Sequence, residues 1–207
     1  MDPLALADFG PVIPVIVIEE FDSAVPLARA LLDGGVRVLE VTLRTPVALR
    51  AIEAIARALP EAVVGAGTVR SATDVQAALD AGARFAVSPG YTSAIGRACI
   101  ERGLALLPGV ATASEVLQAT TDGHRFLKFF PAAVAGGVPM LKAWAGPFAD
   151  VCFCPTGGID AGSAPQYLAL SNVRAVGGSW LTPADAVGAR DWTRITRLAQ
   201  AASALCR

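Results

Sequence analysis

The sequence is poor in the residues that hold metals and redox disulfides. Its 207 residues include one histidine and four cysteines, and Cys152 and Cys154 stand two apart on an expected strand. This spacing suits neither a redox pair nor a zinc knuckle, and one histidine adds little to a zinc ligand set. We therefore expect reduced thiols, as is typical of the cytoplasm, and no metal site.

Charge and long apolar segments are also scarce. Charged residues make up 17% of the chain and the net charge is −1, which gives no reason to expect nucleic acid or an anionic membrane as partner. No apolar run approaches the roughly 20 residues of a membrane span, and the start Met1-Asp2-Pro3 does not resemble a signal peptide. With 54% hydrophobic residues, the chain is expected to form one cytoplasmic domain with a large core.

Lysine is rare as well, with 15 arginines but only Lys128 and Lys142. Lys128 lies within the apolar run 126–131, which is too short for a helix, ends in proline and is typical of a buried strand. A buried ammonium without a partner costs several kcal/mol, whereas a neutral lysine in an apolar pocket attacks carbonyls, which arginine does not. The alternatives are a lysine that extends from the strand end into water and one that pairs with a buried carboxylate.

Along the chain, eight apolar segments predict strands, and helical patterns follow them. The expected strands are 12–18, 36–42, 62–66, 85–88, 105–107, 126–130, 151–153 and 174–176. Their apolar residues do not alternate with polar ones, which is typical of parallel strands covered on both faces. We therefore predict an α/β fold, a (β/α)8 TIM barrel, as a single domain over residues 1–207. A doubly wound open sheet is the alternative.

Several helix starts carry capping signals. Thr45-Pro46 suggests an N-cap followed by proline in the first turn, and Thr112 to Glu115 has the spacing of a capping box. The last helix is predicted over residues 191–206.

In a parallel barrel, the active site forms at the carboxyl ends of the strands. Glu40 shares a strand face with Val38 and Thr42, so we expect it to point into the barrel, as a proton-transfer group or as an ion-pair partner of Lys128. Arg44 ends the same strand and is suited to binding a carboxylate by two hydrogen bonds, although a plain surface arginine is equally compatible with the sequence.

The last two expected strands end in glycine pairs, Gly157-Gly158 and Gly177-Gly178, the second followed by Ser179. Glycine lets backbone N–H groups approach an anion, and a helix N-terminus just beyond would add a favourable dipole. These loops are where many barrels bind phosphate, although glycines also serve plain turns. We expect His124, at a strand edge, to be structural or solvated.

Six segments, in the same order, resemble the family of 2-keto-3-deoxy-6-phosphogluconate aldolases. They are GGVRVLEVTLRT at 34–45, VGAGT at 64–68, SPG at 88–90, FFPA at 129–132, CPTGGI at 154–159 and GGSW at 177–180. Because they span nearly the whole chain, together they are far more specific than any one alone.

The resemblance implies a class I aldolase without metal or other cofactor, usually a homotrimer. It would cleave 2-dehydro-3-deoxy-6-phosphogluconate, a sugar acid of the Entner–Doudoroff pathway, to pyruvate and D-glyceraldehyde 3-phosphate, with 4-hydroxy-2-oxoglutarate as a side substrate. The residues that the resemblance assigns are Lys128 as Schiff-base lysine, Glu40 as general acid–base, Arg44 and Thr68 for the pyruvyl carboxylate, Pro89 and Phe130 as pocket lining, and Thr156, Gly157, Gly158, Gly178 and Ser179 for the phosphate.

Two other functions stay open on the sequence alone. A sister aldolase could act on the galactonate-derived epimer or on an unphosphorylated keto acid. A non-catalytic barrel that binds a phosphorylated metabolite would keep the glycine loops but would not need a buried lysine and glutamate.

Overall fold

The computed structural model describes residues 2–205 and has an α/β fold. Its strands are β1 Val12–Ile16, β2 Val38–Thr42, β3 Val63–Gly67, β4 Phe85–Val87, β5 Ala105–Leu107, β6 Gly109–Val110, β7 Phe126–Phe129, β8 Cys152–Pro155 and β9 Val176–Gly178. Its helices are η1 Pro3–Phe9, η2 Phe21–Ser23, α1 Ala24–Asp33, α2 Ala48–Ala58, α3 Ala72–Asp80, α4 Ser93–Glu101, α5 Ala113–Thr121, α6 Gly137–Trp144, α7 Ala164–Leu168, α8 Ala184–Gly188 and α9 Trp192–Ser203.

All strand pairings are parallel and form two sheets. One sheet has six strands in the order β5-β4-β3-β2-β1-β9, and the other has three in the order β6-β7-β8. Only Pro108 separates β5 from β6. At the other edge, isolated bridges pair Phe153 with Val173 and Thr156 with Gly177, so β8 lies beside the chain that leads into and through β9.

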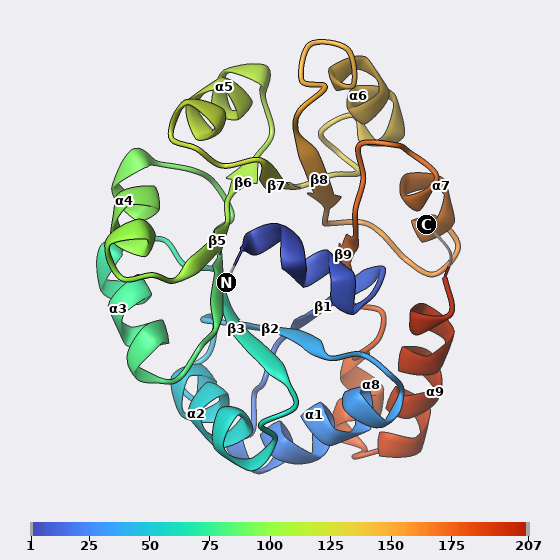
Figure 1. Ribbon diagram of the computed structural model, residues 1–207. Helices are drawn as coiled ribbons and strands as arrows, with labels where there is room; N and C mark the ends of the chain where they lie inside the picture. Colours follow the sequence, from blue (N-terminus) through green and yellow to red (C-terminus); the bar gives the residue numbers. More distant parts are fainter. Residues whose placement is uncertain (1, 206–207) are drawn as a thin grey trace.

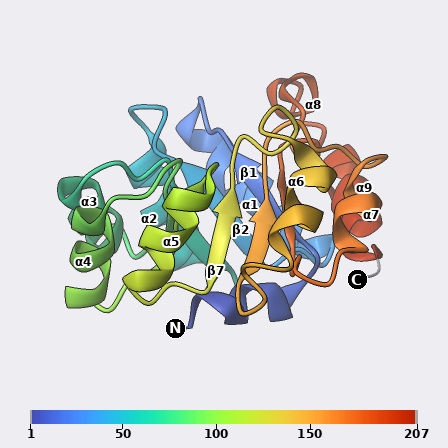
Figure 2. The ribbon, with the colours of Figure 1, turned by 90° about the horizontal axis from the view of Figure 1, so that it is seen from above.

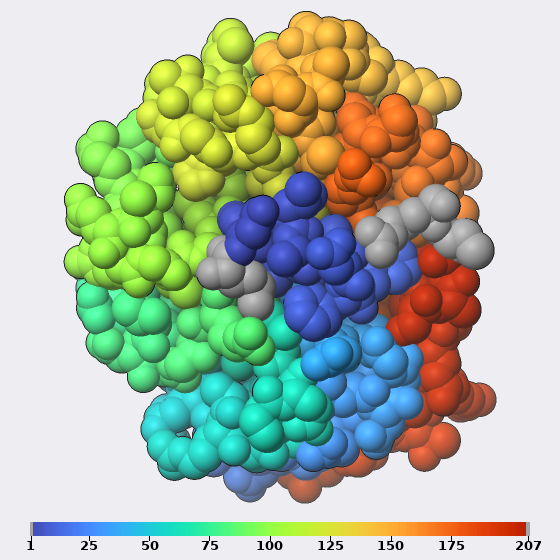
Figure 3. All heavy atoms as spheres, viewed as in Figure 1, coloured from blue at the N-terminus to red at the C-terminus, as the bar shows by residue number. Residues whose placement is uncertain are grey.

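Helices surround the strands, and η1 crosses the middle of the ring that they form (Figure 1). Seen from the side, the strands run away from η1, which covers their amino ends, while α8 lies at their carboxyl ends (Figure 2). The space-filling view shows the dark blue η1 segment filling the centre of this face (Figure 3). One end of the strand assembly is therefore closed by the chain itself.

Two apolar clusters explain the arrangement. The larger one lies between strands and helices and includes Leu39 and Val41 of β2 and Leu127 and Phe129 of β7. The smaller one, which we call the inner core, lies among the strands and consists of Leu6, Ala7, Ile13, Val38, Val63, Phe85, Val87, Ala105, Leu107, Phe126, Cys154 and Ala175. The strands are therefore buried on both faces, as their unbroken apolar sequence predicts.

The sequence placed the eight main strands and the helices between them, although β9 begins two residues later than the strand expected at 174–176. It missed three elements, namely η1, which supplies Leu6 to the inner core, the short helix η2 and the two-residue strand β6. The capping box at Thr112 is confirmed, because its hydroxyl accepts from the Glu115 N–H and the Glu115 carboxylate accepts from the Thr112 N–H. The predicted last helix ends at Ser203 among the described residues, and Cys206 lies outside them.

The prediction of an N-cap at Thr45 was wrong. Helix α2 begins at Ala48 after Val47, which makes no side-chain cap. The Thr45 hydroxyl instead donates to the carbonyl of Ile18 at 2.7 Å and so ties this loop to the end of β1. Across residues 2–205, none of the helices combines the length and the apolar character needed to cross a bilayer.

Candidate active site

Lys128 and Glu40 meet inside the strand assembly. Lys128 lies on β7 and Glu40 on β2, and the lysine Nζ is 3.1 Å from one carboxylate oxygen and 3.5 Å from the other. The two residues are only 5% and 2% exposed. The sequence predicted Glu40 inside the barrel and Lys128 on a buried strand, and the ion pair between them, which it left open as an alternative, is present in the structure.

The position of this pair follows from the alternation of side chains along each strand. On β2, Leu39 and Val41 pack outward against the helices, so Glu40 points inward. On β7, Leu127 and Phe129 pack outward in the same way, so Lys128 also points inward. Burying a single charge in such a site costs much free energy, but here the opposite charges of Lys128 and Glu40 compensate each other. The two side chains therefore lie in direct contact as a buried ion pair.

Gly67, at the end of β3, leaves the space that the Glu40 carboxylate occupies. A Cβ on Gly67 would collide with Glu40 Oε1 and would lie 2.7 Å from its Cγ. Real Cβ atoms do not make contacts that close. The glycine of the segment VGAGT is thus part of the site through its lack of a side chain.

Cys154 is the inward-facing neighbour of Lys128 on β8. The two residues are register partners, and Cys154 belongs to the inner core. Burial raises the pKa of its thiol to about 12, with Lys128 acting in the opposite direction and Glu40 adding to the rise. The thiol therefore stays protonated at neutral pH and is a poor nucleophile.

A cavity of about 260 Å³ opens at the carboxyl ends of the strands, above the ion pair. Seven of the residues that the sequence singled out line it, namely Arg44, Phe130, Thr156, Gly157, Gly158, Gly178 and Ser179. Lys128 and Glu40 do not line the cavity and lie deeper. The Phe130 ring connects the cavity with the ion pair, because it lines the cavity and its centroid lies 5.3 Å from Lys128 Nζ.

Arg44 and Thr68 lie together at the rim. The Arg44 Nε donates to the Thr68 hydroxyl at 3.3 Å, and Thr68 adopts a φ of 60°, in the left-handed region that a β-branched residue rarely enters. Such strain is found where function holds a residue in place. Neither Thr68 nor Pro89 lines the cavity.

The two glycine loops form one wall of the cavity, but their geometry differs from the prediction in one respect. Gly157 and Gly158 have φ values of 98° and 72°, which favour glycine, and a Cβ on Gly177 would collide with the Thr156 hydroxyl. However, α7 begins only at Ala164 and α8 at Ala184, so no helix starts directly after either pair. An anion bound here would meet backbone N–H groups rather than a helix dipole.

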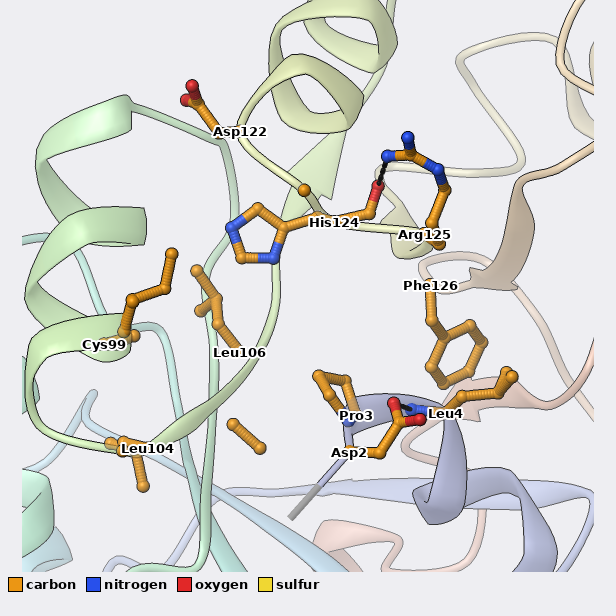
Figure 4. A pocket seen from close by; sticks show the side chains of 14 residues that line it. Asp2, Pro3, Leu4, Cys99, Leu104, Leu106, Asp122, His124, Arg125 and Phe126 are labelled. Carbon is orange, nitrogen blue, oxygen red and sulfur yellow. Dashed lines mark hydrogen bonds between the residues drawn. The ribbon is translucent and has the colours of Figure 1, made fainter.

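A larger cavity, of about 550 Å³, lies at the opposite end of the strands (Figure 4). His124 faces it, and burial lowers the pKa of this imidazole, with Asp122 opposing the shift. The His124 ring packs edge-on against Tyr91 with centroids 5.2 Å apart, and its buried Nε2 has no hydrogen-bond partner. Within residues 2–205, His, Cys, Asp and Glu side chains form no group of three that could hold a metal ion.

Sequence reasoning missed Val15, Val17 and Ile159, which also line the smaller cavity, and the place of Cys154. Cys154 could have been found, because it shares a strand face with Cys152 and lies on the strand after the lysine strand. The valines could not, because their strand is apolar throughout and nothing in it marks the residues that end at a cavity.

A model of the KDPG and KHG aldolase family matches residues 6–198. The chain belongs to this family. A curated relative from Escherichia coli K12, named KHG/KDPG aldolase, is 53% identical over 93% of this chain and 91% of its own.

Solved structures of this family share the fold. A KDPG aldolase from Legionella pneumophila, with pyruvate captured as a covalent carbinolamine, has a TM-score of 0.97 and 48% identity over 99% of both chains. The enzyme of Zymomonas mobilis ZM4 with 3-phosphoglycerate has a TM-score of 0.95 and 49% identity over 100% of this chain and 97% of its own.

Proposed function

We propose that this protein is a class I aldolase that cleaves 2-keto-3-deoxy-6-phosphogluconate to pyruvate and D-glyceraldehyde 3-phosphate. The observation that carries the proposal is the buried Lys128–Glu40 pair, 3.1 Å apart, directly beneath a cavity whose wall holds two glycine loops and an arginine. The names of the relatives and the pyruvate carbinolamine of the Legionella enzyme support the same chemistry.

The reaction begins with the lysine. Glu40 takes the proton of Lys128, and the neutral amine attacks the C2 ketone of the sugar acid. Glu40 returns this proton to the alkoxide oxygen and then carries a second proton from the nitrogen to the same oxygen, so that water leaves and a protonated imine remains. This imine withdraws electrons from the adjacent carbon, so the C3–C4 bond is weakened.

Cleavage needs a base at the C4 hydroxyl, and Glu40 is the group in reach of the lysine that can serve. It removes the hydroxyl proton, directly or through a water, and the C3–C4 bond breaks with its electrons passing into the imine as an enamine. Glyceraldehyde 3-phosphate leaves, C3 is protonated, and hydrolysis releases pyruvate. General acid–base assistance of this kind contributes roughly 10²–10⁴-fold.

The other predicted residues hold the substrate. Arg44 and Thr68 bind the carboxylate of the pyruvyl half, with Thr68 fixing the guanidinium through the 3.3 Å hydrogen bond. Phe130 and Pro89 border the reacting carbons. The phosphate lies against Thr156 and the backbone of Gly157, Gly158, Gly178 and Ser179.

A second activity, cleavage of 4-hydroxy-2-oxoglutarate, is favoured by the double name of the Escherichia coli relative. The smaller keto acid needs Lys128, Glu40 and Arg44 but not the glycine loops. We expect it to be cleaved with a lower kcat/KM, because the binding energy of the phosphate is absent.

The proposal extends to the fold, the cellular location and the oligomeric state. The two parallel sheets form one (β/α)8 barrel and a single domain over residues 1–207, supported by the bridges between β8 and the β9 region. The protein is a cytoplasmic homotrimer; the free thiols of Cys99, Cys152 and Cys154 support the location, and the family resemblance supports the trimer. Light scattering at working concentration tests the trimer.

The activity is tested by pyruvate release from three substrates side by side. These are 2-keto-3-deoxy-6-phosphogluconate, its galactonate-derived epimer and 4-hydroxy-2-oxoglutarate. We expect the highest kcat/KM with the first. Higher kcat/KM with the epimer would assign the protein to the galactonate series, and no pyruvate from any of the three would contradict the aldolase function.

A further inference from the structure

The cavity of about 550 Å³ at the amino ends of the strands, which we call the amino-end cavity, takes no part in the proposed reaction. It lies where hydrogen bonds do not close the ring of strands. β5 is the last strand of the six-stranded sheet, and β6 pairs with β7 only from Lys128 onward, so none of the described strands pairs with Phe126 on this side. The volume of the cavity falls within the roughly 300–1,000 Å³ of ligand-binding cavities.

Many of the side chains that line the amino-end cavity are apolar. Leu104, Leu106 and Phe126 contribute buried side chains. Leu4 and Ile100, which are 39% and 63% exposed, also line it and are two of the four exposed large hydrophobic residues in the described part of the chain. Because shielding apolar surface from water is favourable, these walls suit the carbon skeleton of a ligand.

The charged groups of the amino-end cavity already have partners. The Asp2 carboxylate accepts from the Leu4 N–H at 2.9 Å, and the Asp122 carboxylate accepts three side-chain hydrogen bonds. The Arg125 guanidinium lies 3.0 Å from the carboxylate of Asp150. A charged ligand would lose its water here without meeting an unpaired charge of opposite sign, so the cavity suits a neutral one.

His124 supplies the hydrogen-bonding group of the amino-end cavity. Its Nε2 is buried and has no partner among the described residues, and its other ring nitrogen, Nδ1, is turned toward Leu106 and the cavity (Figure 4). Burial lowers the pKa of the imidazole, so the ring is neutral at neutral pH. One nitrogen of a neutral imidazole donates and the other accepts, and a hydroxyl group can pair with either.

We propose that the amino-end cavity is a binding site for a neutral, largely apolar alcohol or phenol, whose hydroxyl group pairs with His124 while its carbon skeleton lies against the apolar walls. This site lies at the opposite end of the strands from Lys128 and uses none of the residues of the proposed reaction. The proposal is therefore independent of the aldolase function.

The first measurement uses His124 as its own reporter. The chain has one histidine, so the imidazole C–H signals in the NMR spectrum of the untagged protein belong to this residue alone. The probe is 4-ethylphenol, and 4-ethyltoluene, in which a methyl group replaces the hydroxyl, is the matched control. We expect 4-ethylphenol to shift these signals saturably with a Kd of about 1 mM or lower, and 4-ethyltoluene to bind at least about fivefold more weakly. No saturable shift, or equal Kd values for the two compounds, overturns the proposal.

The second measurement changes the walls, with binding followed by calorimetry. Ile100→Ala removes an exposed apolar wall and should raise the Kd of 4-ethylphenol about threefold or more. Leu117→Ala is the matched control, because Leu117 is 58% exposed on the neighbouring helix α5 and does not line the cavity. In folded His124→Phe, the Kd values of the two compounds should agree within about twofold, because the hydrogen bond is lost. Equal Kd values in the Ile100→Ala and Leu117→Ala variants overturn the proposal.

The third measurement locates the ligand. The kcat/KM for sugar-acid cleavage should change less than twofold when 4-ethylphenol saturates the His124 signal. Competitive inhibition with the Kd measured by NMR would place the phenol at the carboxyl-end cavity and overturn the proposal. A wild-type protein that cleaves no sugar acid even without the phenol contradicts the aldolase function instead, and the NMR titration still decides the binding site.

Discussion

The two ends of the strands carry cavities that differ in size and in chemistry. The amino-end cavity is about 550 Å³ and the carboxyl-end cavity about 260 Å³, yet only the smaller one lies over the buried Lys128–Glu40 pair. At the amino end, Asp122 just after α5 accepts from Tyr91 and Ser93, next to and at the start of α4, and from Gln118 of α5. Cavity size therefore does not mark the proposed active site; the buried contact between a lysine and a glutamate does.

Removing the amine of Lys128 should have the largest effect on activity. Lys128→Met keeps the length of the side chain but cannot form an imine, so we expect kcat to fall by on the order of 10⁴-fold or more. Lys142→Met, at the other lysine, which is exposed on α6, should keep activity. Circular dichroism must show that both variants fold; a folded Lys128→Met enzyme with substantial turnover would refute the role.

Removing the base has the next largest effect. Glu40→Gln keeps the shape and a hydrogen bond to Lys128 but can no longer carry the proton, and we expect kcat to fall roughly 10²–10⁴-fold. Glu53→Gln, whose carboxylate only pairs with Arg57 on the surface of α2, is the control. Near-normal steady-state turnover in the Glu40→Gln enzyme would take Glu40 out of the mechanism.

A smaller loss should follow when Glu40 is kept but displaced. The methyl group of Gly67→Ala would collide with the Glu40 carboxylate and move it from Lys128, and a misplacement of about 1 Å can cost roughly 10²-fold. Gly146→Ala, where a Cβ meets nothing within 4 Å, should leave kcat unchanged. Equal kcat values for the two variants would mean that the placement of Glu40 is not critical.

A substitution at the amino end of the strands should change the stability of the protein but not its catalysis. Burial holds the pKa of His124 below its usual 6.5, so the unfolded chain binds a proton that the folded chain does not. Stability is therefore full above pH 6.5 and falls as the pH drops through the window between 6.5 and the lower folded pKa. His124→Gln should flatten this part of the unfolding profile, measured by urea denaturation from about pH 7.5 to about pH 5, with kcat at the upper pH unchanged.

Asp122 affects stability in a lower pH range than His124, so the two contributions can be separated. Hydrogen bonds from Ser93, Tyr91 and Gln118 lower the pKa of its carboxyl from 3.8, so its stabilisation is present above that value and lost as the pH falls further. An unchanged slope between about pH 7.5 and about pH 5 in the His124→Gln variant would show that the histidine does not titrate as its burial requires.

Much of the site followed from the sequence for local reasons. Alternation along β2 was enough to turn Glu40 inward, the short apolar run around Lys128 marked a buried strand, and the glycine pairs marked two loops that line one cavity. What the sequence did not reveal depends on distant contacts. Leu6 joins the inner core from a segment that no strand pattern marks, and Val17 borders the 260 Å³ cavity together with residues of distant loops such as Gly157.

The most direct test of the central claim is to trap the imine. The protein is incubated with pyruvate and borohydride, which reduces the imine to a stable adduct, and peptide mass spectrometry then locates the added mass. The account predicts a single adduct on Lys128. An adduct on Lys142, or none on folded protein, would contradict it.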